Sequence, residues 1–202
     1  MVLASNVAES KKRMGKYEEV IIKKLVAYFN SKGYEVIPHS RLNIAWGSII
    51  SDVDLLLLKD GLITCVEVKS CKDKIARAPE QINRIRDFVD YAYVATERTV
   101  KNWAVPDVGL ILVQEGTIKT VKRARKFKNK PRFLSVLSLK KKCLAKMFDM
   151  NIKYMHRINK YDLAQNAYSA KGTKCNRKYL REIVTCGESC NLYCPITDAT
   201  LK

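Results

Sequence analysis

The sequence predicts an α/β fold in which a mixed β-sheet is flanked by helices. Residues 20–29 carry apolar side chains at the spacing of a single helix face. Two apolar, β-rich runs at 53–58 and 62–68 flank Asp60-Gly61, a dipeptide that favours a tight hairpin turn because it tolerates positive φ. Helix and strand signals then alternate, which is typical of helices that cover a sheet.

The remaining elements follow from the same rules of spacing and turn chemistry. Gly33 indicates the end of the first helix, and Pro79 suits the first turn of a later one. Glu115-Gly116 indicates a second hairpin. The order is therefore helix, three strands, helix, strand, helix and strand pair. The expected ranges are helix 14–32, strand 34–38, loop or hairpin 39–51, strands 53–58 and 62–68, helix 79–89, strand 91–95, helix 97–103, and strands 108–114 and 117–121.

A change of composition divides the chain into a core, residues 1–130, and a small helical appendage, residues 131–202, which is basic and contains cysteines. A length of 202 residues fits one compact domain with such an appendage. Pro131 indicates the boundary between the two. Within the appendage, helices are expected at 134–148, 162–168 and 178–184.

The chain is strongly basic, with 38 Lys and Arg against 20 Asp and Glu and a formal net charge of +18. Nucleic acid is the first partner that such a charge predicts, and a surface tuned for solubility is the alternative. No acidic residue occurs between Glu115 and Asp149. We therefore expect this segment to contact DNA phosphates, although a charged linker would look similar. The expected DNA-binding residues in it are Lys122, Arg123, Arg125, Lys126, Lys128 and Lys130.

The predicted hairpin places two acids across from one another. Asp54 and Glu67 lie at similar distances from the turn, so their side chains are expected within reach of one cation. Oxygen ligands of this kind suit Mg²⁺ or Mn²⁺. Lys69 shares a face with Glu67, where its ammonium can position water or stabilise phosphate charge, while Val68 points to the opposite face. The alternative is an ordinary surface ladder of Glu and Lys, which the strongly apolar strands disfavour.

The stretch SDVDLLLLKDGLITCVEVKS, residues 51–70, resembles the PD-(D/E)xK nuclease superfamily. It is most like archaeal Holliday-junction resolvases and related archaeal viral nucleases, over roughly residues 14–125. The resemblance implies a restriction-endonuclease-like αβββαβ core, a homodimer, and phosphodiester hydrolysis with one or two metal ions. It implies that Asp54 and Glu67 bind the metal with the carbonyl of Val68, and that Lys69 is catalytic. Val53 replaces the name-giving proline.

The resemblance also implies a glutamate from the first helix and a glutamine from the helix after the hairpin. Glu18 shares a face with Ile21 and Leu25, so it is the expected helix carboxylate, with Glu19 as the alternative. Gln81 is the expected glutamine, and an exposed helix position is the alternative. Ser70 and Lys72 are further candidates for phosphate contacts at the strand end.

Four cysteines crowd the C-terminal end of the chain. Thiolates in such a group can bind zinc or an iron–sulfur cluster, but their spacing equally permits disulfides or free thiols. The four are Cys175, Cys186, Cys190 and Cys194. The start of the sequence has no apolar leader, and no stretch approaches the ~20 apolar residues that span a bilayer, so a soluble, intracellular protein is expected, in the host cytoplasm if it is viral.

These observations together predict a Mg²⁺-dependent DNA endonuclease, structure-selective if the resolvase resemblance holds. One alternative is an exonuclease or restriction-like nuclease that acts on linear DNA. Another is a catalytically silent DNA-binding protein with the same fold. DNA is the expected partner in each case.

Overall fold

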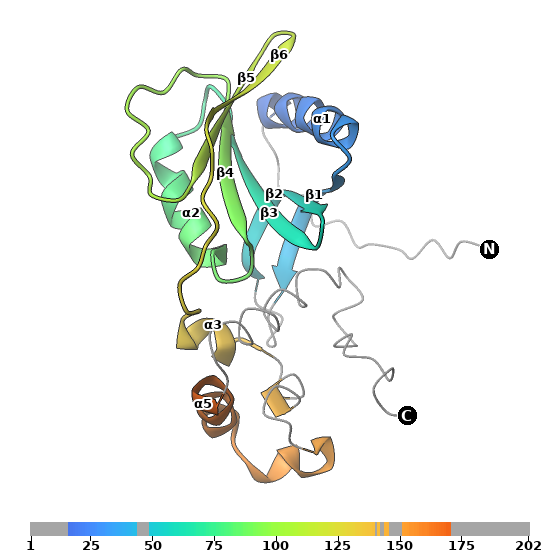
Figure 1. Cartoon of the computed structure of the whole chain (residues 1–202), viewed down its shortest axis with the longest axis vertical. Helices are drawn as coiled ribbons and strands as arrows, with labels where there is room; N and C mark the ends of the chain where they lie inside the picture. Colours follow the sequence, from blue (N-terminus) through green and yellow to red (C-terminus); the bar gives the residue numbers. More distant parts are fainter. Residues whose placement is uncertain (1–15, 44–48, 140, 142–143, 146–150, 171–202) are drawn as a thin grey trace, which may run out of the picture.

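A computed structural model describes residues 16–43, 49–139, 141, 144–145 and 151–170 of the chain. Within these ranges the protein is built on a six-stranded mixed sheet with the strand order β1-β2-β3-β4-β5-β6 (Figure 1). Pairing is antiparallel for β1–β2, β2–β3 and β5–β6, and parallel for β3–β4 and β4–β5. The predicted α/β class with a mixed, helix-flanked sheet is confirmed.

The described elements have the following bounds. The strands are β1 (Glu35–Asn43), β2 (Ile49–Lys59), β3 (Leu62–Lys69), β4 (Tyr91–Thr96), β5 (Gly109–Gln114) and β6 (Thr117–Lys122). The α-helices are α1 (Lys16–Ser31), α2 (Ala78–Ile85), α3 (Phe133–Leu137) and α5 (Lys160–Ala170), and the 3₁₀ helices are η1 (Ile75–Arg77) and η2 (Ile152–Arg157).

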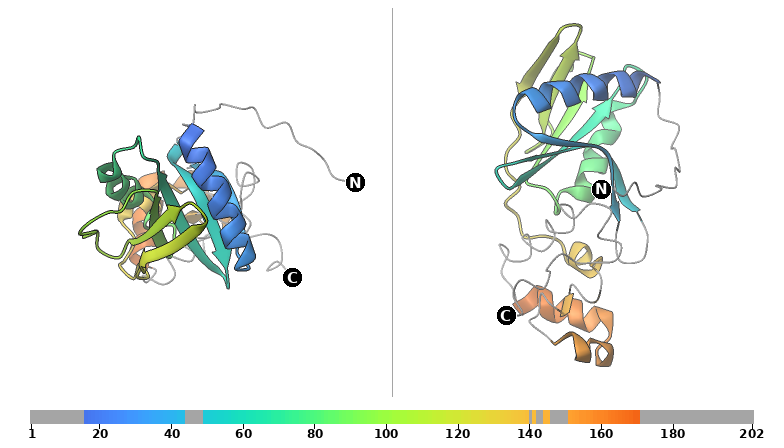
Figure 2. Two further views of the ribbon diagram at one scale, coloured as in Figure 1. Left: turned by 90° about the horizontal axis from the view of Figure 1, so that it is seen from above. Right: turned by 90° about the vertical axis from the view of Figure 1, so that its right-hand side faces the viewer.

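Two apolar layers hold the sheet between the helices. Helix α1 lies over one face of the sheet (Figure 2). There, Ile21 and Leu25 of α1 pack with Val66 and Val68 of β3. On the other face, the apolar side of α2 packs with Cys65 of β3 and with its neighbours in the sheet. Successive side chains of a strand point to opposite faces, so β3 serves both layers and is buried along nearly its whole length.

The turn between β2 and β3 forms as the Asp-Gly dipeptide predicts. Asp60 and Gly61 both have positive φ, 51° and 67°, and Lys59 pairs with Leu62 across a two-residue loop. Such a turn fixes the register of the two strands. Lys59 Nζ also donates a hydrogen bond of 2.7 Å to the Lys32 carbonyl, which holds the end of α1 beside the hairpin.

The segment at 39–51, expected as a loop or a hairpin, takes the hairpin form, because it contains the end of β1 and the start of β2, which pair antiparallel. Two local predictions in the core are wrong. The helix expected at 97–103 is a loop, in which Trp103 Nε1 donates to the Val108 carbonyl. The helix from Pro79 ends at Ile85 rather than at 89, because the chain turns there to bury Phe88 and Val89.

The described part of the appendage packs against the core. It lies beyond one end of the sheet in Figures 1 and 2. Leu163 of α5 and Val136 of α3 belong to the same apolar cluster as α2, and Arg132 Nε donates to Asp87 Oδ2 at 2.7 Å. The helix expected at 134–148 is interrupted, since α3 ends at Leu137 and helix is described again only at 141 and 144–145. The expected helix at 162–168 lies within α5, and that at 178–184 lies outside the described residues.

No helix within the described ranges is long and apolar enough to cross a membrane.

Substitution of Gly109, at the start of β5, tests the packing of the sheet. A Cβ there would lie 2.3 Å from the Tyr93 ring and 2.8 Å from the backbone nitrogen of Ala124, which cannot move aside as a side chain can. Gly109→Ala is expected to lower the free energy of unfolding by about 1–3 kcal/mol, measured by urea denaturation. Gly116→Asn, in an open turn at φ 70°, is the control and should change it by less than about 0.5 kcal/mol. Equal stability of both variants would contradict this packing.

Candidate functional site

The hairpin brings the two predicted acids together. The ladder of β2 and β3 runs as far as the pair Leu55–Val66, and Asp54 and Glu67 are the next residues along the two strands. Asp54 Oδ2 accepts a hydrogen bond of 2.7 Å from the backbone N–H of Val68, which fixes the carboxylate against the neighbouring strand. The structure thus places Asp54 where the spacing predicts.

Glu67 and Lys69 form a buried ion pair. They lie two residues apart on one face of β3, and Lys69 Nζ is 2.6 Å from Glu67 Oε1. The relative exposure is 3% for Glu67 and 7% for Lys69. Removing two charges from water costs several kcal/mol per ion, and their mutual attraction offsets this only in part. The surface ladder that the sequence left as an alternative is therefore wrong for this pair.

Glu18 reaches the same place from the first turn of α1. Burial, and then the nearby carboxylates of Asp73 and Asp54, raise the pKa of Glu18, while the Lys69 ammonium opposes this shift. Glu19 behaves differently, because it is exposed and forms an ion pair of 2.9 Å with Lys23. A hydrogen bond from Lys23 lowers the pKa of Glu19. The helix face predicted for Glu18 is confirmed, and Glu19 lies on the solvent side.

Asp73 is a member of this cluster that the sequence does not single out. Its carboxylate accepts a hydrogen bond of 2.8 Å from the backbone N–H of Ser70 and another from Ser70 Oγ. Burial would raise the pKa of Asp73, but these bonds and one from Glu18 outweigh it and lower the pKa. The only local signal is an acid three residues after a strand-end serine, which is too common to single out a site.

Gln81 lies on the sheet-facing side of α2. It shares that side with Ala78, Ile82 and Ile85, which are buried against the sheet. This is the face of the sheet to which Glu67 and Lys69 point, and α2 starts shortly after Lys69. The side-chain oxygen of Gln81 is buried and has no hydrogen-bond partner among the described residues. An unpaired buried acceptor is costly, so the exposed helix position left open for Gln81 is wrong.

The carboxylates can be compared with what a magnesium ion requires. Among the described residues, no three His, Cys, Asp or Glu side chains are arranged as a ready-made metal cage. Mg²⁺ does not need one, since one or two carboxylates with waters and substrate phosphates commonly hold it. The neighbouring carboxylates of Asp54 and Glu67 supply hard oxygen donors of that kind, and the structure therefore fits Mg²⁺ in its donor chemistry.

The strand-end candidates differ in their surroundings. Ser70 is buried, and both its N–H and its hydroxyl are engaged with Asp73, so it organises the turn instead of facing solvent. Lys72 is exposed. The Val68 side chain packs in the α1-side layer, away from Glu67 and Lys69, as the alternation predicts.

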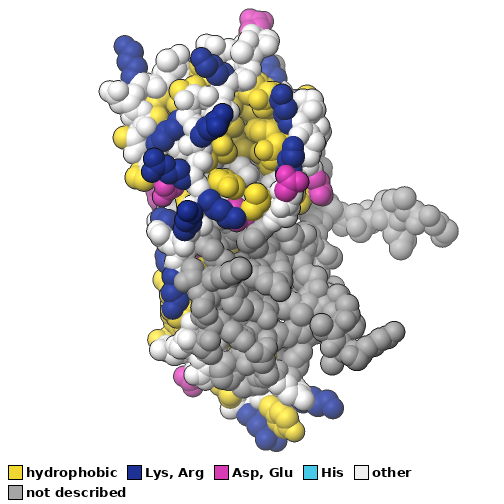
Figure 3. Space-filling view, in the orientation of Figure 1, with side chains coloured by type: hydrophobic (Ala, Val, Ile, Leu, Met, Phe, Trp, Pro, Cys, Tyr) yellow, Lys and Arg dark blue, Asp and Glu magenta, His cyan; other side chains and the backbone are white. Residues whose placement is uncertain are grey.

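The basic residues at 122–130 that are expected to bind DNA do not lie beside these carboxylates. β6 ends at Lys122, and the chain then runs extended toward α3, past the start of β4. Lys122 Nζ donates to the Val105 carbonyl at 2.8 Å, and Lys130 lies over the Tyr168 ring at 4.0 Å, so both have structural contacts. Arg123, Arg125, Lys126 and Lys128 are exposed. Lys and Arg side chains are spread over the sheet part of the face in Figure 3.

The four C-terminal cysteines lie outside the described residues, so their state stays a prediction. Within the described part, Cys65 and Cys71 are free thiols. Cys65 lies beneath the site, where burial, and then the charges of Glu67 and Asp54, raise the pKa of its thiol well above the ordinary value. A thiol held protonated in this way contributes packing, not nucleophilic chemistry.

Comparison with known proteins gives a family. The model of the family described as bacteriophage P4 protein cII matches residues 14–189. The chain belongs to this family. No functionally curated protein gives a significant match. Among solved structures, SPO1766, a protein of unknown function from Silicibacter pomeroyi, is similar with a TM-score of 0.45 and 18% sequence identity, covering 58% of this chain and 77% of that one.

The pH dependence of stability tests the carboxylate cluster. The fold raises the pKa of Glu18, so its stabilising contribution is present below its ordinary pKa of 4.5 and is lost as the pH rises through the folded-state value. In chelator, Glu18→Gln is therefore expected to raise the melting temperature at pH 8 and to change it little at pH 4, measured by differential scanning calorimetry.

Glu19→Gln is the matched control for this measurement. Its pKa is lowered in the folded protein, so its loss should not raise the melting temperature at pH 8. An equal rise for both variants, or a fall for Glu18→Gln, would show that Glu18 does not lie in a repulsive cluster.

Proposed function

We propose that this protein is a metal-dependent nuclease that hydrolyses phosphodiester bonds in DNA, with its active site at Asp54, Glu67 and Lys69. One observation carries the proposal: Lys69 and Glu67 form a buried ion pair beside the carboxylate of Asp54. Apolar side chains at these strand positions would give comparable stability without the desolvation penalty. Buried charges retained in this way are typical of a site whose chemistry needs them.

Each side chain has a role that follows from its charge. The carboxylates of Asp54 and Glu67 would hold Mg²⁺ or Mn²⁺, together with the Val68 carbonyl that the nuclease resemblance implies. Bound there, the ion would supply positive charge to the scissile phosphate. Lys69 carries an ammonium that can orient the attacking water or stabilise charge that develops on phosphate oxygens. Glu18 and Gln81 would assist as a further acid and a polar contact from the two flanking helices.

The choice of DNA as substrate rests on charge and on the resemblance of residues 51–70 to archaeal resolvases. A net charge of +18 attracts polyanions, and the binding it supports is salt-dependent and weakly sequence-specific. The same resemblance supports a homodimer with two sites and a preference for branched DNA. An exonuclease or restriction-like activity on linear DNA would use the same residues.

A DNA-binding protein without catalysis is the second candidate. It is favoured by the short contact between Lys69 and Glu67, which occupies one oxygen of the proposed metal ligand. In that case the ion pair would serve only to stabilise the hairpin, and metal would change neither binding nor the DNA.

Substitution of the proposed site residues tests the assignment. Asp54→Asn and Lys69→Ala are expected to lower the cleavage rate by about 10²–10⁴-fold while leaving DNA affinity in chelator within about threefold of the wild type. Lys101→Ala, at an exposed loop position, is the control and should cleave normally. Wild-type cleavage by either site variant would show that the site lies elsewhere.

The substrate is tested by a cleavage panel. Labelled four-way junctions, flaps, linear duplexes, single-stranded DNA and RNA are incubated with Mg²⁺, Mn²⁺ or chelator and resolved on denaturing gels. The resolvase-like assignment predicts metal-dependent nicking of the junction ahead of the other substrates. Shortening of linear ends would instead identify an exonuclease, and intact nucleic acid in every lane would favour the binding protein.

A further inference from the structure

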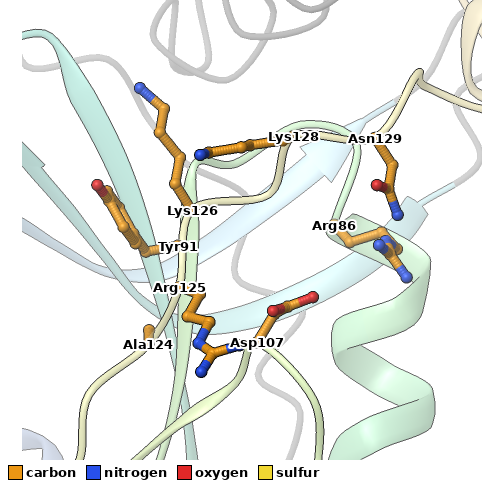
Figure 4. A pocket seen from close by; sticks show the side chains of 8 residues that line it. All are labelled: Arg86, Tyr91, Asp107, Ala124, Arg125, Lys126, Lys128 and Asn129. Atoms are coloured by element: carbon orange, nitrogen blue, oxygen red, sulfur yellow. The ribbon is translucent and has the colours of Figure 1, made fainter.

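A basic cavity lies at the end of the sheet opposite to the carboxylates. Its volume is about 670 Å³, within the range of pockets that bind small ligands or parts of larger ones. Arg86 enters it from the end of α2, while Arg125, Lys126 and Lys128 come from the extended segment after β6 (Figure 4). Asp107 is the one acidic residue in its lining, so the cavity is strongly positive.

Most of the positive charge in this cavity is uncompensated. Within the described part of the chain, Arg86, Arg125 and Lys128 have no ion pair. Lys126 is 3.5 Å from Asp90, a longer contact than the others in the structure. Several like charges held together without partners repel one another, and an anion would relieve this repulsion.

The fold holds these cations in place. Backbone N–H groups of Arg125 and Phe127 donate to the carbonyls of Asp107 and Asp90, at 3.0 and 2.9 Å. Phe127 is 4% exposed and packs in the α2-side apolar layer, and the Arg86 guanidinium lies over its ring at 5.3 Å. The segment is therefore an anchored part of the core, and not the loose charged linker that the sequence left open.

The cavity and the proposed active site lie at opposite ends of the same part of the sheet. Tyr91, in the cavity lining, pairs with Thr64 of β3, whereas Lys69 pairs with Thr96 five residues further along both strands. At about 3.3 Å per residue along a strand, this offset separates the cavity from the proposed active site by roughly 16 Å. One duplex strand advances ~3.4 Å per base pair, so the separation corresponds to roughly five base pairs.

We infer that the cavity formed by Arg86, Arg125, Lys126 and Lys128 is a phosphate-binding anchor for the DNA backbone, about five base pairs from the bond positioned at Asp54 and Glu67. This inference rests on the proposed function for its choice of DNA. The anchor reads no bases, because its cations address phosphate oxygens only. It holds the duplex in register, so that a phosphate further along reaches the carboxylates.

The anchor is tested by DNA binding in chelator, where cleavage cannot interfere. The variant is Arg125→Gln/Lys128→Gln, which removes two exposed, unpaired cations and leaves the packing of Phe127 intact. Affinity for a labelled 30-base-pair duplex is measured by fluorescence anisotropy at several salt concentrations. The plot of log K against log salt has a negative slope, and each lost phosphate contact reduces its magnitude by about 0.9. The magnitude should therefore decrease by about 2 in this variant, and the affinity at low salt by at least about tenfold.

The matched control removes two exposed lysines away from the cavity, Lys119→Gln/Lys153→Gln. Its slope should stay within about 0.5 of the wild type. An equal loss in both variants would mean that net charge alone attracts DNA, and a wild-type slope in the cavity variant would mean that DNA does not enter; each overturns the anchor. Pyrophosphate binding by calorimetry, lost in the cavity variant while its DNA affinity is unchanged, would assign the cavity to a free phosphate compound and also overturn it.

Cleavage kinetics separate this inference from the proposed function. With Mg²⁺, the cavity variant should show a raised KM and an unchanged kcat, because its loss affects binding and not the chemical step. If the wild type cleaves no DNA but the cavity variant binds more weakly, the anchor stands and the nuclease proposal fails. If the wild type cleaves and the variant matches it in KM and in affinity, the nuclease proposal stands and the anchor fails.

Discussion

The antiparallel pairing of β2 with β3 is the constraint on which the rest of the structure depends. Its two-residue turn at Asp60 and Gly61 leaves one register, and that register puts Asp54 beside Glu67. A shift by one residue would turn every side chain of β3 to the other face, which would move Val66 and Val68 out of the α1-side layer and place Glu67 and Lys69 in it. The two apolar layers oppose such a shift, so the core and the carboxylates are positioned by the same pairing.

The charged side chains near this hairpin influence one another and are best described as a group. Glu67 and Lys69 neutralise one another, whereas Glu18, Asp54 and Asp73 bring more negative charge than Lys69 can balance. Burial, and then the nearby carboxylates of this excess, raise the pKa of Glu18. Surplus negative charge attracts cations, and the proposed divalent metal site depends on this feature.

The family match spans residues 14–189, which includes both the sheet and the appendage. This extent agrees with the packing, since α3 and α5 share an apolar cluster with α2. Arg132 also donates a hydrogen bond to Asp87 across the boundary between the core and the appendage. Asp87 also accepts from Ser135 Oγ at 2.7 Å. The extended segment between β6 and α3 is thus held at both ends, which keeps its cations at one end of the sheet.

The sequence by itself determined the elements whose signals are local. Apolar spacing gave α1 and the inward face of Glu18, turn chemistry gave both hairpins, and alternation placed Glu67 and Lys69 together. Contacts between distant segments decided the rest. The loop at 97–108, the early end of α2, the place of Asp73 beside Glu18, and the cavity between Arg86 and Lys128 all depend on partners far apart in the chain. Periodicity records which face of an element is apolar, but not which element covers it, and so only the tertiary structure could bring these residues together.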